Sequence, residues 1–233
     1  MAISDHLTIL SQEEINRLYD LPKIDEEDRA LFFEITPEDE AYLKKQTVVN
    51  NKINYLLQVG YFRATRQFYK FTFQQAKDDT WFIINQHFPG TNFPKKNIDI
   101  NKHYSAQKMI CDIYGYTRSN VEFIAKLNQH AKKLTSRNLQ PKFVFDELLE
   151  FCERHKTIRP KYSTLQSIVS KAILREENRL NLKLERLLNK TEKADLDSLL
   201  TKEDLFHHLT LLKKDPKSFN TKEMHKELGR VIN

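Results

Sequence analysis

The sequence predicts an all-α, multi-helical fold. Among its 233 residues are only 4 Gly and 7 Pro, whereas 30% are charged, a composition typical of helices with few loops. Apolar residues recur at steps of three and four, and helix-capping residues stand where several of these runs begin. The hydrophobic fraction of 39% is sufficient for one large or two small cores, which excludes a disordered chain.

The N-terminal region is predicted to form short helices with acidic starts. Ser11 and Glu14 have the spacing of a capping box, and a second acidic helix is expected over 25–33. Thr36 is expected to cap a third helix whose first residue is Pro37. The acidic residues near these starts complement the helix dipoles, so we do not interpret them as metal ligands.

After a polar break, a further helix is expected to begin near Asn50. It would form a helix-turn-helix with the helix before it, and the second helix of such a motif enters the major groove by its N-terminal end. The asparagines could read adenine, although ordinary solvated positions are an equally good interpretation. Basic residues interleaved with aromatics over 61–73 could stack on unpaired bases, but a core role for those aromatics is the preferred interpretation. The DNA contacts expected in this first unit are Lys44, Lys45, Asn50, Asn51, Asn54, Arg63 and Arg66.

The domain boundary is predicted where turn-forming residues gather, after a helix over about 73–88 that carries the single tryptophan. The predicted parts are a first helical unit (1–90), a linker (91–101), a second helical unit (102–190) and a short helical tail (191–233). In the second unit Ser105 and Ser119 are expected caps, Gly115 a left-handed helix end and Pro141 a first helical residue.

The stretch 157–180 is the strongest candidate for function. Pro160 stops whatever precedes it, Ser163 and Gln166 have capping-box spacing, and an amphipathic helix follows to about Asn189. Basic and hydroxyl side chains at a helix N-terminus suit a phosphate, although an ordinary solvated helix start is the simpler alternative. The DNA contacts expected in the second unit are Lys102, Lys108, Arg118, Arg137, Arg159, Lys161, Tyr162, Ser163, Thr164 and Lys171.

The net charge of +6 is unevenly distributed along the chain. Residues 1–46 hold 12 acidic and 5 basic residues, a balance of −7, which leaves +13 for the rest. A positive field attracts polyanions, and no segment is suited to a membrane, so nucleic acid is the expected partner. Cys111 and Cys152 show no partner spacing and are expected to be buried thiols of a cytoplasmic protein.

Motifs that carry chemistry are missing from the sequence. It contains no phosphate-binding glycine loop, HExxH, paired CxxC or nucleophile-elbow pattern. Cys152 and His155 have ligand-like spacing, but two candidates do not complete a four-ligand zinc site. We therefore expect no catalytic residues, metal, cofactor or small-molecule substrate.

Several segments together resemble one protein family. They are ILSQEEINRLYDLPKID, NYLLQVGYFRATRQFYKF, FPG, YGY, IRPKYSTLQSIVSKAILREENRL and TKEDLFHHLTLLKKDPKSFNTKEMHKEL. In this order they resemble the N-terminal region of transposases of the Tn-three family. Lys161 departs from the pattern, since glycine is expected to be common there.

The resemblance implies helical helix-turn-helix units that bind the terminal inverted repeats of a transposon, with other transposase subunits as further partners. In that family the metal-dependent nuclease core lies several hundred residues farther on. We therefore expect a non-catalytic DNA-binding module, associated with the bacterial nucleoid when bound.

Two alternatives come from other classes of function. The leucines of the long helix could pair with another helix in a protein-interaction module, but their spacing drifts instead of holding a strict heptad. An active nuclease or recombinase lacks the residues that it would need.

Overall fold

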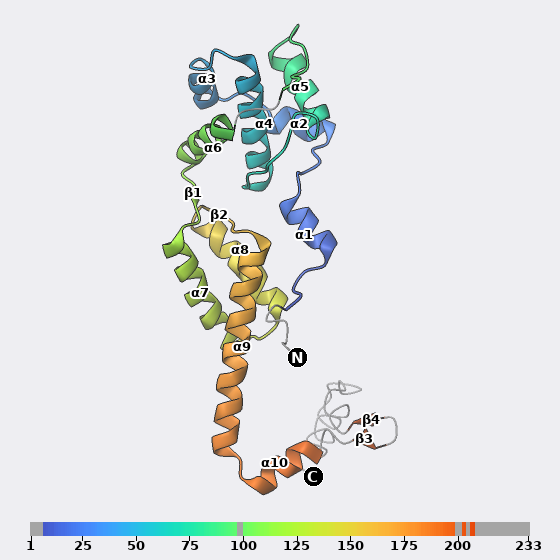
Figure 1. Cartoon of the computed structure of the whole chain (residues 1–233), viewed down its shortest axis with the longest axis vertical. Coiled ribbons are helices and arrows are strands. Elements are labelled where there is room, and N and C mark those ends of the chain that lie inside the picture. The colour runs from blue at the N-terminus through green and yellow to red at the C-terminus, as the bar shows by residue number, and fades with distance from the viewer. Residues whose placement is uncertain (1–6, 97–99, 199–201, 204–205, 208–233) are drawn as a thin grey trace, which may run out of the picture. The chain divides into compact units, whose positions relative to one another are not determined.

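The computed structural model describes residues 7–96, 100–198, 202–203 and 206–207, and it confirms the all-α class (Figure 1). Contacts divide the chain into two units, residues 1–176 and 177–233. The described helices of the first unit are α1 (Gln12–Tyr19), α2 (Glu26–Phe32), α3 (Pro37–Leu43), α4 (Val49–Thr65), α5 (Lys77–His87), α6 (Ile100–Tyr114), α7 (Val121–Thr135), α8 (Pro141–Arg154) and α9 (Tyr162–Leu187), of which α9 continues into the second unit.

The first core is built around α4. Every residue of this helix from Ile53 to Phe62 is buried, and α2, α5 and α6 all pack against it. Gly60 allows one of these contacts, because a Cβ atom there would lie 2.2 Å from the ring of Phe33. The enclosed part of α4 does not include its first turn, where Asn50 and Asn51 are half-buried. The helix-turn-helix predicted for the first unit therefore stays a prediction, limited to that first turn.

Two buried carboxylates tie neighbouring helices to α4. Asp39 accepts hydrogen bonds from Tyr55 Oη at 2.8 Å and from the Arg63 guanidinium. Asp79 accepts from Tyr61 Oη at 2.7 Å and from Arg29 Nε at 2.7 Å. Each acid thus has a tyrosine and an arginine as partners. Such hydrogen-bonded partners allow a charged carboxylate to be buried.

The second core combines α7, α8 and the first half of α9 with a distant segment of the chain. Leu127, Phe145 and Val169 are fully buried there, and Leu10 from the N-terminal segment joins them. Leu7 N–H donates to Ser170 Oγ at 3.0 Å, while Gln166 Nε2 donates to Leu7 O at 2.9 Å. The N-terminal segment is therefore fixed along α9.

The cores do not follow the domain boundaries that the sequence predicts. Residues 9–18 pack with the second core, although they were assigned to the first unit. Conversely, α6 begins inside the predicted linker and packs against α4, where Ile110 is fully buried. Glycines and prolines near residue 90 mark a turn, but burial of apolar faces decides which helices share a core.

Helix starts were predicted with mixed success. The capping box at Ser11, the Thr36 cap with Pro37 and the first helical residue Pro141 are confirmed. Gly115 has the predicted positive φ, of 68°.

Three other predicted caps are wrong. Ser105 lies inside α6, where its hydroxyl donates to Asn101 O at 2.8 Å. The side chain of Asn120, and not that of Ser119, caps α7. Ser163 forms no capping box because α9 begins one residue earlier and the Gln166 amide bonds Leu7 instead.

A parallel pair of two-residue strands links the segment before α7 to the segment after α8. No sequence pattern predicts it. Thr117 of β1 (Thr117–Arg118) is paired with Thr157 of β2 (Thr157–Ile158). Ile158 contributes to the first core, whereas α9, which begins four residues farther on, contributes to the second. The pair therefore lies at the junction of the two cores.

The described part of the second unit contains the end of α9, α10 (Lys190–Ser198) and a two-residue antiparallel pair, β3 (Lys202–Glu203) with β4 (Phe206–His207). Of the helical tail predicted for 191–233, the residues in α10 are helical and residues 202–203 and 206–207 are strands, while the remainder lies outside the described residues. Within the described ranges, no helix is both long and apolar enough to cross a membrane.

Candidate nucleic-acid interface

The first four turns of α9 have one buried and one exposed side. Leu165, Ile168, Val169, Ala172 and Ile173 are buried in the second core. Lys161, Ser163, Lys171 and Arg175 are exposed, while Thr164 and Ser167 are half-buried. Positions 163, 167, 171 and 175 are four residues apart and share one side of the helix. The N-terminal half of α9 thus presents a stripe of hydroxyl and basic side chains.

A groove of about 440 Å³ runs between this stripe and α7. Ser163, Thr164, Ser167 and Lys171 line it from α9, and Asn128 and Ile124 line it from α7. The Asn128 amide is held in place because its Nδ2 donates to Ile124 O at 2.8 Å. The groove therefore brings together hydroxyl, amide and ammonium groups, which hydrogen-bond both phosphates and base edges.

The polar groups of this stripe have no partners within the described residues. No hydrogen bond or ion pair there engages the side chains of Lys161, Ser163, Thr164, Ser167 or Lys171. In the same region Lys142 is paired with Glu14 at 3.1 Å. We name this set of five side chains, together with Asn128, the α9 face.

Four of the predicted DNA contacts are instead occupied inside the protein. Arg63 donates to Asp39, to Phe32 O at 3.0 Å and to Tyr114 Oη at 2.7 Å. The side chain of Asn54 is hydrogen-bonded to His103 at 3.2 Å, and only 2% of the residue is exposed. We assign both residues to structure, because their polar groups point away from any surface.

Arg159 and Tyr162 lie at the start of α9 but also face inward. Arg159 Nη2 donates to Thr65 O at 3.0 Å, and the guanidinium lies 5.8 Å from the centre of the Tyr19 ring. The Tyr162 hydroxyl accepts the backbone N–H groups of Ile9 and Leu10, each at 3.4 Å. These side chains fix the N-terminal segment against α9, so they position the α9 face instead of extending it.

Two further predicted arginines are exposed but stacked. Arg66 lies over the rings of Phe62 and Tyr114, at 5.6 and 5.8 Å from their centres. Arg118 lies 5.2 Å from the centre of the Tyr104 ring and donates to Gln107 Oε1. A guanidinium on an aromatic ring keeps its other face and its remaining N–H groups for a ligand.

The remaining predicted contacts are on the surface but not gathered with the α9 face. Lys44 pairs with Glu40 at 3.0 Å in an exposed ion pair, which a phosphate could displace at little cost. Asn50 and Asn51 are half-buried in the first turn of α4. Lys45, Lys102, Lys108 and Arg137 are exposed on the α3–α4 turn, on α6 and after α7.

Sequence reasoning missed Ser167 and Asn128. Ser167 could have been found, since it lies four residues from both Ser163 and Lys171. Asn128 could not, because only the packing of α7 beside α9 brings it to the groove. No local pattern distinguishes it from other asparagines.

The two cysteines are free and buried, as predicted. Burial raises the pKa of the Cys152 thiol to about 12, so this group is not a ready nucleophile or metal ligand. His155, the other residue with ligand-like spacing, is exposed, and its Nδ1 lies 2.9 Å from Phe151 O. Within the described ranges no three His, Cys, Asp or Glu residues are grouped to hold a metal ion.

The fold and the α9 face together define an all-α protein with two cores and one exposed, polar and basic helix face. The family model described as "Domain of unknown function (DUF4158)" matches residues 9–172, and the chain belongs to this family. The match includes the first core, all of the second core except Ile173, and the whole of the α9 face. No curated protein matches the chain.

Proposed function

We propose that this chain is a non-catalytic module that binds double-stranded DNA, and that its target is the terminal inverted repeat of a transposon. The observation that carries DNA binding is the α9 face, where unpaired hydroxyl and ammonium groups line one groove together with the Asn128 amide. The inverted repeat as target comes from the resemblance of the chain to Tn-three-family transposases. In the proposed complex, other transposase subunits supply catalysis.

The division of roles within the α9 face follows from its chemistry. Lys161 and Lys171 neutralise phosphates, which supplies affinity that depends on salt but not on sequence. Ser163, Thr164 and Ser167 contact base edges or phosphates by hydrogen bonds, and Asn128 reaches the same groove. Affinity and specificity would thus reside in different side chains.

A salt titration of two double variants tests the site. We expect Lys161→Ala with Lys171→Ala to weaken binding to all DNA sequences alike. The slope of log K against log salt should become shallower by about 0.9 per lost contact, or about 1.8. The matched control, Lys44→Ala with Lys45→Ala, removes the same charge from the first core and should change the slope less. A larger change of slope in the Lys44 and Lys45 variant would instead place the interface on the surface over the first core.

Specificity requires a separate measurement. Asn128→Ala should reduce the preference for an inverted-repeat duplex over a scrambled duplex, because a lost base contact costs about 1–3 kcal/mol, while the salt slope stays unchanged. Footprinting on the transposon end in the presence of competitor DNA would locate the contacted bases. Equal affinity for repeat and scrambled duplexes would refute the target while leaving DNA binding intact.

A second candidate function, helix pairing with a protein partner, is favoured by one observation. Leu182, Leu184 and Leu187 are 54%, 49% and 67% exposed on the last turns of α9. Exposed leucines along one helix are typical of surfaces that another chain covers. Light scattering distinguishes the candidates, since a stable oligomer whose mass is indifferent to DNA would favour pairing as the primary function.

A further inference from the structure

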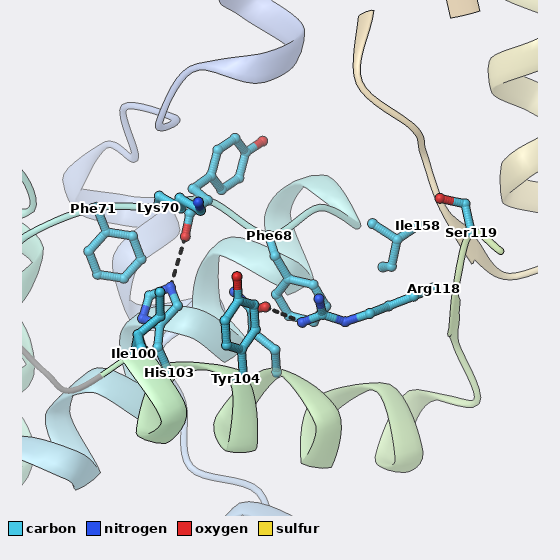
Figure 2. Close-up of a pocket in the computed structure, with 11 residues that line it drawn as sticks. Phe68, Lys70, Phe71, Ile100, His103, Tyr104, Arg118, Ser119 and Ile158 are labelled. Carbon is cyan, nitrogen blue, oxygen red and sulfur yellow. Dashed lines mark hydrogen bonds between the residues drawn. The ribbon is translucent and has the colours of Figure 1, made fainter. Parts of the chain in front are cut away.

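A second cavity, lined by none of the residues of the α9 face, lies between α6 and the segment that follows α4 (Figure 2). Its volume is about 480 Å³, within the range of roughly 300–1,000 Å³ that is usual for pockets holding small ligands. Tyr104 and Ile100 line it from α6, and they are 42% and 57% exposed. Large apolar groups are thus open to a ligand at its mouth.

The charged groups around this cavity are cationic. Among its eleven lining residues, Lys70 and Arg118 are charged and none is acidic. Arg118 lies over the ring of Tyr104, so a cation and an aromatic face are presented together. Burial and the nearby cations lower the pKa of His103, which favours its neutral form.

The floor of the cavity is a fixed row of polar groups. Arg118 donates to Gln107 Oε1, and Gln107 Nε2 donates to Gln58 Oε1 at 3.1 Å. Gln58 Nε2 lies 2.9 Å from Nε2 of the His103 ring, which is also 3.2 Å from Tyr69 O, while Nδ1 of the same ring is 3.2 Å from Asn54 Oδ1. The tautomer of His103 decides which of these groups donates. The side-chain oxygen of Gln107 accepts from Arg118, and that of Gln58 accepts from Gln107. The hydrogen bond from Arg118 therefore sets the orientation of both amides. The guanidinium is therefore held in place before any ligand arrives.

We propose that this cavity, lined by Tyr104, Arg118, Lys70 and Phe71, receives one unpaired nucleotide of a DNA strand. The base stacks on the exposed aromatic and guanidinium surface, and the phosphate is bound by Arg118 and Lys70. Aromatic rings beside cations are the chemistry by which proteins hold unstacked bases. This inference rests on the proposed function, because it takes DNA as the ligand.

Position on the helix supports a strand rather than a free nucleotide as the source. Lys108 is exposed and lies four residues after Tyr104 on α6, so it continues the cationic surface beyond the mouth of the cavity. A free mononucleotide would not contact Lys108, whereas the next phosphate of a strand would reach it.

Binding to paired DNA and to DNA with one unpaired nucleotide tests the proposal. The probes are an inverted-repeat duplex, the same duplex with a single bulged nucleotide, and deoxyadenosine monophosphate as a competitor. We expect the full chain to bind the bulged duplex about tenfold more tightly than the paired one, since its unpaired base is free to stack on an aromatic side chain. Tyr104→Ala should abolish this preference and Tyr104→Phe should retain it. Phe143→Ala, which removes an equally exposed ring from α8, is the control.

Each outcome decides between the hypotheses. Equal affinity of the wild-type chain for both duplexes would overturn the nucleotide pocket and leave the proposed function standing. Loss of preference in Phe143→Ala as well would also overturn it, because the effect would then not belong to the cavity. Competition by the free nucleotide without any preference for the bulge would assign the cavity to a mononucleotide instead of a strand. No affinity for any DNA would overturn both this inference and the proposed function.

Discussion

Replacing Arg63 by alanine is expected to lower the free energy of unfolding by about 3 kcal/mol, near the lower end of the 3–5 kcal/mol typical for a broken buried ion pair. The residue's side chain is only 11% exposed, and that of its partner Asp39 is fully buried. Removal of the guanidinium therefore leaves a carboxylate without a counter-charge in the first core. It also leaves the carbonyl of Phe32 without its donor.

The remaining partners of Asp39 set the magnitude. The carboxylate still accepts from Tyr55 Oη at 2.8 Å, and from Thr36 N and Oγ1, each at 2.9 Å. These three donors keep part of the negative charge stabilised, so we place the loss at the lower end of the range. Domains of this kind have a total stability of about 5–15 kcal/mol, and the variant should therefore still fold.

Urea unfolding followed by circular dichroism measures the effect. The midpoint should fall while the slope with denaturant stays the same, which identifies a change in stability alone. Arg17→Ala is the control, because Arg17 is 75% exposed in an ion pair with Glu13 and should contribute less than about 1 kcal/mol. A loss below about 1 kcal/mol for Arg63→Ala would refute the buried ion pair. A salt slope for DNA shallower by about one unit would instead restore Arg63 as a phosphate contact.

Two further predictions concern the interior of the first core. Gly60→Ala should destabilise the protein by about 1–3 kcal/mol in urea unfolding, despite the better helix propensity of alanine, because the new Cβ would meet the fully buried ring of Phe33. An unchanged or higher midpoint would mean that the ring can move aside. Burial lowers the pKa of His103 below its ordinary value of 6.5, so its contribution to stability is present above pH 6.5 and is lost as pH falls through the lowered pKa. Unfolding free energies at pH 7.5 and 5.5 should therefore differ less in His103→Gln than in the wild-type chain, and an equal difference would contradict the assignment.

From the sequence, the presence of a helix could be predicted better than the surroundings into which that helix packs. Capping signals are local, and Ser11, Thr36 and Pro141 could be identified because a cap depends on residues only three positions apart. The helix α4 shows the limit. Its N-terminal amides and flanking lysines have the form of a recognition helix, but the burial of its residues from Ile53 to Phe62 depends on packing against α2, α5 and α6, which no local pattern shows.

The candidate site could be predicted only in part for the same reason. Lys161, Ser163 and Lys171 were identified from their place on one amphipathic helix, and they are exposed as expected. From the sequence alone, Arg63 and Arg159 cannot be distinguished from these exposed residues, since each is a cation next to aromatics or prolines. Their partners, Asp39 and the carbonyl of Thr65, are separated from them by 24 and 94 residues. Whether a cation is available to a ligand is decided by such distant partners.

The distribution of charge in the fold also differs from its distribution along the chain. Part of the acidic segment 1–46 is paired with cations: Asp39 lies in the first core with Arg63, while Glu14 pairs with Lys142 beside the second core. These carboxylates neutralise cations that the sequence would count toward an attractive field. What remains for a polyanion are the cations without such partners, and on the N-terminal half of α9 these are Lys161, Lys171 and Arg175. Counterion release scales with contacted phosphates, so these three side chains would account for a salt slope of only about 2.7. A steeper slope requires additional phosphate contacts, and the cations around the Tyr104 cavity are in a position to supply them.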